Sequence, residues 1–190
     1  EYIADVYSNN SQLEENDIWN MITDSQRYTV AAAFRDLTID DTGIDDPRVD
    51  VFQNPDDPFA IDGATPLFQA RKYVFSTAPI RLASFDEAQY IIAEVRAAQG
   101  DLAGAIALIN ELRAAHGVTQ QWSGSGQDAV LRKILDERGR TLFLEGQRMG
   151  DMRRYLEAYG IDVFPVSPTP EEATTCMPLP NAERQNNPGI

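Results

Sequence analysis

Two glycine-terminated segments at residues 84–117 place the strictest limit on how this chain can fold. Ser84 and Glu87 form a capping box at the start of the first segment. Apolar residues then recur at helical spacing: Phe85, Ala88, Ile92 and Val95. The second segment keeps a helical period until His116, and a glycine follows it. Because only Gln99–Asp101 separate them, the two helices must form an antiparallel hairpin.

Small residues in both segments allow the two backbones to approach closely: Ala93, Ala97, Ala98, Gly104, Ala105 and Ala107. The pattern resembles a tetratricopeptide repeat, and one copy of it is visible. A single repeat cannot cover its own apolar face. We therefore expect the hairpin to pack on neighbouring elements, including a part of the protein that precedes Glu1.

A third, longer helix is predicted over Asp128–Leu144, with a continuation beyond it. Its seam alternates spacings of four and three: Leu131, Leu135, Arg138, Leu142, Glu145 and Met149. Burying an unpaired charge is costly, so the charged seam residues need partners. We predict that Arg138 pairs with a carboxylate of the hairpin, with Glu94 as the first choice. A local ladder of i, i+3 pairs is predicted through Glu145, Arg148 and Asp151.

The chain divides into a loop-rich N-terminal segment with a short helix, residues 1–83, and a helical region, residues 84–190. We expect both to belong to one compact unit cut from a longer protein. The stretch Asp36–Asp62 holds nine Asp, one Arg and three Pro, which predicts a long solvated loop with a turn at DDPR. This stretch does not fit the EF-hand ligand pattern. A short helix is predicted over Gln26–Leu37 and an extended segment over Phe68–Phe75.

Charge and composition argue against several classes of function. The formal net charge is −14 at pH 7, so nucleic acid and anionic lipid surfaces would be repelled. The single Cys176 and the single His116 cannot supply an internal disulfide or a tetrahedral zinc site. We expect no metal and no cofactor. No window of the sequence approaches the roughly 20 apolar residues of a membrane-spanning helix.

Four motifs resemble the SusD/RagB family in their type and order. The segment ERGRTLFLEGQRMGDMRR, residues 137–154, is similar to the family's signature helix. The hairpin motif, YIIAEVRAAQGD followed by LINELR, precedes it, and DDPR lies further upstream. The segment MPLPNAERQNNPG, residues 177–189, is similar to the family's closing pattern. The chain departs from the family at Gly139 and Thr141, where Arg and Glu are usual.

The resemblance implies a mainly α fold, with a tetratricopeptide-like hairpin packed on a long helix among long irregular loops. It implies a surface-exposed outer-membrane lipoprotein, whose anchor and signal would lie upstream of this C-terminal portion. Such a protein binds a glycan without catalysis and passes it to a SusC-like TonB-dependent transporter. The signature residues are expected to be structural: Glu94, Arg113, Glu137, Arg138, Glu145, Gly146, Arg148, Asp151 and Arg154.

Aromatic side chains among polar residues are the candidates for sugar binding. Trp19 lies between Asn and Asp residues in NDIWN, and Arg27 and Tyr28 follow close behind it. Trp122 lies in the glycine-rich segment QQWSGSG. Trp19 could instead fill a core beside Ile18, and a loop around Trp122 would be poorly preorganised for binding. Trp19, Arg27, Tyr28 and Trp122 are therefore the predicted ligand-binding residues.

Three alternative functions remain open from the sequence. The hairpin is compatible with a helical-repeat adaptor that binds proteins, and the family resemblance with a peptide-binding member. A glycoside hydrolase would need two carboxylates about 5–9 Å apart, and nothing in the sequence singles out such a pair. A lipobox cysteine upstream of Glu1 would favour the transporter-associated receptor, whereas further 34-residue repeats there would favour the adaptor.

The basic residues predict a dependence on salt. Lys72 and Lys133 are the only lysines among 16 basic residues, and the acids are mostly Asp. This usage is consistent with a salt-adapted organism, and a GC-rich genome that favours Arg codons would explain it as well. Under the first hypothesis the melting temperature falls when salt is removed. A melting temperature that does not change with ionic strength would contradict it.

Overall fold

The computed structural model describes residues 3–6 and 15–164. It contains two compact units, residues 1–148 and residues 149–190. The domain boundary predicted after residue 83 stays a prediction. Cys176 and the closing motif at residues 177–189 lie outside the described residues.

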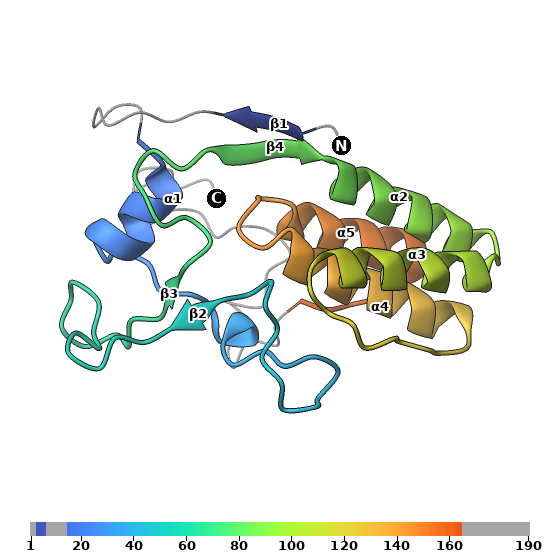
Figure 1. Cartoon of the computed structure of the whole chain (residues 1–190), viewed down its shortest axis with the longest axis horizontal. Helices are drawn as coiled ribbons and strands as arrows, with labels where there is room; N and C mark the ends of the chain where they lie inside the picture. Colours follow the sequence, from blue (N-terminus) through green and yellow to red (C-terminus); the bar gives the residue numbers. More distant parts are fainter. Residues whose placement is uncertain (1–2, 7–14, 165–190) are drawn as a thin grey trace, which may run out of the picture. The chain divides into compact units, whose positions relative to one another are not determined.

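Three helices of the first unit pack on one another. Helices α2 (Phe85–Ala98) and α3 (Leu102–Ala115) form the predicted hairpin, and α4 (Gln127–Thr141) lies against both of them (Figure 1). The Ser84 hydroxyl accepts a hydrogen bond from the Glu87 amide at 3.2 Å, so the predicted cap is present. The mainly α fold class, with a hairpin packed on a longer helix, is confirmed.

The apolar stripe predicted for α2 does not face the core. Phe85, Ile92 and Val95 are 42–48% exposed, and Ala88 is also exposed. The buried side of α2 consists of Asp86, Tyr90, Ala93, Glu94 and Ala97. Contact with both α3 and α4 requires close backbone approach, and the small alanines permit this whereas the larger stripe residues do not. The expectation based on apolar spacing was therefore wrong for this helix.

The long third helix ends earlier than the sequence predicts. After Thr141 the chain turns, and the backbone is left-handed at Leu144 (φ 61°) and Gly146 (φ 80°). A right-handed helix cannot pass through such residues. The next helix, α5, spans Arg148–Tyr159. The predicted seam through Glu145 and Met149 on one continuous helix is wrong, and Gly146 supplies a backbone conformation that other residues adopt only with strain.

Short strands and turns organise the segment before the hairpin. Strand β1 (Ile3–Val6) pairs antiparallel with β4 (Ile80–Ser84), and β2 (Val51–Phe52) pairs antiparallel with β3 (Gln69–Ala70). Helix α1 (Asp17–Trp19) runs into a π-helical turn at Asn20–Asp24. The extended segment predicted over Phe68–Phe75 is confirmed only at β3. None of the described helices is long and apolar enough to cross a membrane.

The helix predicted over Gln26–Leu37 is reduced to one 3₁₀ turn at Ala32–Phe34. Tertiary hydrogen bonds hold the start of this segment extended, since the Val30 amide donates to the Phe68 carbonyl at 2.9 Å. Val30 then joins a small core with Val49, Ala70 and Phe143. The Phe34 ring stacks on Phe143 with centroids 5.0 Å apart, so the loops contact the end of α4 through apolar packing.

A matched pair of substitutions tests which side of the hairpin is buried. Ile109 on α3 is fully buried, whereas Ile92 on α2 is 42% exposed. We expect Ile109→Ala to lower the free energy of unfolding by about 2–5 kcal/mol and Ile92→Ala to change it by about 0.5 kcal/mol or less. Urea denaturation measures both, and equal losses would contradict the buried face described above.

Candidate functional site

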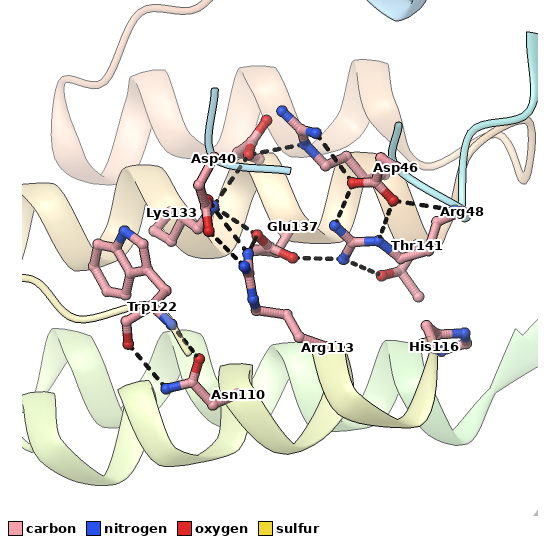
Figure 2. Close-up of polar contacts among 12 residues, drawn as sticks. Asp40, Asp46, Arg48, Asn110, Arg113, His116, Trp122, Lys133, Glu137 and Thr141 are labelled. Carbon is pink, nitrogen blue, oxygen red and sulfur yellow. Dashed lines mark hydrogen bonds and ion pairs between the residues drawn. The ribbon is translucent and has the colours of Figure 1, made fainter. Parts of the chain in front are cut away.

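A buried carboxylate, Glu137 on α4, lies at the centre of an ion network (Figure 2). Its two oxygens accept hydrogen bonds from Arg113 on α3 and from Arg48 in the DDPR turn. Lys133, one helical turn earlier, lies 2.6 Å from the same carboxylate. The side chains of Glu137 and Arg113 are 0% and 1% exposed. The network therefore connects α3, α4 and the acidic loop.

Residues of the acidic loop complete this network, which corrects the prediction of a fully solvated loop. Asp46 is buried and binds Arg48 at 2.6 Å and Arg140 at 3.1 Å. Asp40 pairs with Arg113 and, at 2.6 Å, with Lys133 (Figure 2). The predicted turn is present, since the Asp46 carboxylate accepts a hydrogen bond from the Arg48 amide at 3.1 Å. Cationic side chains of α3 and α4 (Arg113, Lys133 and Arg140) pair with these aspartates and hold them against the helices. Composition does not reveal such tertiary contacts.

The network determines the ionisation of its carboxylates. Burial alone would raise the pKa of Asp46, but hydrogen bonds and charge from Arg48 outweigh it and lower the pKa to about 2. Burial likewise opposes ionisation of Glu137, and the charges of Arg48 and Lys133 lower its pKa overall. Both groups are therefore ionised at neutral pH.

The remaining signature residues also make specific contacts. Arg138, with its side chain 3% exposed, contacts the Glu87 carboxylate of α2 at 3.2 Å. The expected hairpin carboxylate is thus found, while pairing with the buried Glu94 stays a prediction. Glu145 pairs with Lys72 at 2.6 Å, and its predicted ladder step to Arg148 stays a prediction. In the second unit, Arg154 contacts Asp151 at 3.0 Å.

A local contact explains why glycine occupies position 139, where the SusD/RagB pattern usually has arginine. A Cβ atom at this position would lie 3.0 Å from the Arg148 guanidinium, whose Nη1 donates to the Leu135 carbonyl at 3.4 Å. Glycine therefore leaves room for the Arg148 side chain. These contacts favour a structural role for the signature block, which stays a prediction.

A separate cavity, here called the loop pocket, lies among the loops before the hairpin. It has a volume of about 320 Å³ and is lined by Arg27, Thr29, Ala60, Ile61, Asp62 and Thr65. Backbone hydrogen bonds join its two sides, since the Ile61 amide donates to the Gln26 carbonyl at 3.1 Å. The Thr29 hydroxyl donates to the Pro66 carbonyl at 2.9 Å. The pocket is thus held from two distant segments of the chain.

The lining side chains offer both donors and acceptors to a ligand. Arg27 is exposed, and within the described residues its guanidinium makes no hydrogen bond or ion pair. A hydrogen bond from the Thr65 hydroxyl, assisted by backbone amides of residues 64 and 65, lowers the pKa of Asp62 to about 2. Tyr28, next to Arg27, is 62% exposed, and Phe59 is 46% exposed. Arginine, carboxylate, hydroxyl and aromatic groups therefore occur together on these loops.

Of the predicted ligand residues, Arg27 lines this pocket, whereas Tyr28, Trp19 and Trp122 do not. Trp19 is half-buried on α1, where its amide donates to the Asn16 side chain at 3.0 Å. Trp122 is half-buried between α3 and α4, and its backbone exchanges two hydrogen bonds with the Asn110 side chain, at 2.8 and 2.9 Å (Figure 2). The loop carrying Trp122 is thus more ordered than its glycines suggest. The sequence reasoning missed Thr29, Asp62 and Thr65, although the spacing of Asp62 and Thr65 is typical of an Asx turn.

Comparison with known proteins identifies the helical part of the chain. Residues 76–163 match the SusD family model. This match confirms the resemblance to the family found in the sequence. A search of curated proteins found no match.

A crystal structure of a SusD-like carbohydrate binding protein from Bacteroides vulgatus ATCC 8482 matches the fold with a TM-score of 0.57 and 24% sequence identity. The match covers 78% of this chain and 33% of that protein. The chain therefore spans about a third of the solved structure that it resembles.

The network makes a testable prediction about Glu137. Glu137→Gln leaves Arg48 and Arg113 without their shared buried counter-charge, and we expect a loss of about 3–5 kcal/mol in the free energy of unfolding. Asp128→Asn removes a carboxylate from an exposed pair with Arg132 and should cost about 1 kcal/mol or less. Urea denaturation of the two variants measures the difference. Similar losses would show that the buried pairs contribute no more than a surface pair.

The lowered pKa values also predict acid sensitivity. Asp46 and Glu137 have lower pKa values in the folded chain than their ordinary values of 3.8 and 4.5. Their contribution is therefore complete above those ordinary values and is lost as the pH falls through their lowered pKa values, about 2 for Asp46. We expect melting temperatures to fall in this window, and less steeply for Glu137→Gln. An unchanged slope in the variant would contradict a role for Glu137.

Proposed function

We propose that this chain is part of a SusD-like cell-surface lipoprotein that captures an oligosaccharide without changing it chemically. In this proposal the glycan then passes to a SusC-like TonB-dependent transporter in the outer membrane. The family match over residues 76–163 supports the proposal. The fold likeness to a protein described as carbohydrate binding supports the kind of ligand. Delivery to a transporter rests on the family match alone.

The chemistry of the loop pocket is the observation that carries glycan binding. Sugar hydroxyls need donors and acceptors at close range, and the pocket offers the Arg27 guanidinium and the Asp62 carboxylate. Sugar rings also stack on exposed aromatic faces, and Tyr28 lies next to Arg27 in the chain. The two sides of the pocket are already joined by hydrogen bonds, so little ordering is required on binding.

The composition of the same pocket supports binding rather than hydrolysis. A glycoside hydrolase uses two carboxylates on opposite sides of the scissile bond. As lined by the described residues, the loop pocket holds one carboxylate, Asp62, and the Thr65 hydroxyl and amide bind it. An acid engaged in holding its own turn is poorly placed to transfer protons to a substrate.

Substitution of Arg27 and Tyr28 tests the proposal. A neutral-glycan array followed by calorimetry should identify an oligosaccharide that binds the intact chain. Arg27→Gln and Tyr28→Ala should each weaken its binding about tenfold, because the first removes a charged donor and the second a stacking face.

Two matched variants serve as controls. Arg132→Gln removes an exposed arginine from α4, and Phe75→Ala removes a 67% exposed ring away from the loop pocket. Both should bind the glycan like the unmodified chain. Full binding of the glycan by Arg27→Gln would place the site elsewhere. If no glycan on the array binds the chain while members of a peptide library do, a peptide ligand is favoured.

A further inference from the structure

A second cavity lies where the DDPR turn, the segment before β4 and the ends of α3 and α4 meet. Its volume is about 400 Å³, within the range of small-ligand sites. Five basic side chains line it: Arg48, Arg71, Lys72, Arg81 and His116. Asp50 and Glu145 are the acids in its lining. We call this cavity the basic pocket, and its excess of cations contrasts with a chain of net charge −14.

The basic residues fall into two groups by how firmly the protein holds them. Arg48 is buried and bound to Asp46 and Glu137, so it forms a fixed wall. Arg71 and Arg81 are held loosely, with nearest carboxylates at 3.8 Å (Asp50) and 4.0 Å (Asp86). Both distances exceed the length of a hydrogen bond. Within the described residues, these two guanidinium groups therefore keep donors for a ligand, although Arg71 also lies over the Phe52 ring.

Like charges face one another in this cavity. Lys72 is largely withdrawn from solvent, and its pKa is lowered by burial and further by the charge of Arg81. Glu145 at 2.6 Å opposes this effect but does not cancel it. An anion placed among these cations would relieve the repulsion. His116 lies beside them, 3.0 Å from Asp86.

We propose that the basic pocket binds the carboxylate of an acidic sugar, with Arg71 and Arg81 as its ligands and Lys72 as a further counter-charge. Planar guanidinium groups match the two oxygens of a carboxylate. Asp50 and Glu145 accept hydrogen bonds from the ring hydroxyls. The inference rests on the proposed glycan binding for the kind of molecule, and it adds a charge class and a second subsite.

Calorimetry on the full chain with trigalacturonate and its methyl ester tests this proposal. The two probes share a scaffold and differ in charge. We expect the acid to bind at least about tenfold more tightly than the ester and to lose affinity at high salt. Equal affinities, or no binding of the acid, would overturn the proposal without the need for any variant.

The double variant Arg71→Gln/Arg81→Gln locates the binding. Both side chains are about a third or more exposed, so we expect the variant to fold, and its thermal melting curve checks this. It should bind trigalacturonate at least about tenfold more weakly and lose the preference for the acid. Arg132→Gln, which removes one exposed cation elsewhere, should keep that preference. Unchanged binding by the folded double variant would overturn the assignment.

Binding of neutral glycans and of trigalacturonate, each measured with the unmodified chain and with Arg27→Gln, separates the two proposals. If neutral glycans bind through the loop pocket while trigalacturonate does not bind, the basic-pocket inference fails and the proposed function stands. If trigalacturonate binds with the expected preference and neutral glycans do not bind, the basic pocket stands and the loop pocket is not the glycan site.

Discussion

The shared ion pairing of Glu137 is the interaction on which the rest of the first unit depends. This carboxylate has no access to solvent, so it can remain charged only because Arg48 and Arg113 both bind it. The two arginines come from segments far apart in the chain. One carboxylate therefore fixes the position of a loop turn against two helices, and Arg48 of that turn lines the basic pocket.

Local sequence signals predicted the start and the two ends of the hairpin correctly. Ser84 and Glu87 marked the start of the hairpin, and glycines marked its two ends, because caps and left-handed turns depend on a few neighbouring residues. The need for a partner to Arg138 followed from the cost of a buried charge, and the structure supplies Glu87. Such features carry their physical cause within a short stretch of chain.

Features set by tertiary contacts escaped the sequence reasoning. The orientation of α2 depends on close approach to two helices, which favours the alanine side over the side of Ile92. Asp46 is buried only because cations from distant segments surround it. For the candidate site, composition pointed to Arg27 and Tyr28, whereas Asp62 became relevant only when the fold brought its turn beside Arg27.

The choice of arginine in the network has a consequence for alkaline conditions. Three of its cations, Arg48, Arg113 and Arg140, are guanidinium groups, which keep their protons far above neutral pH. Neighbouring carboxylates raise the pKa of Arg48 and Arg140 further despite the opposing effect of burial. Burial also raises the pKa of Tyr90, which bonds to Thr141, to about 12. The arginine pairs of this network therefore keep their charge far above neutral pH, whereas its carboxylates lose theirs in acid.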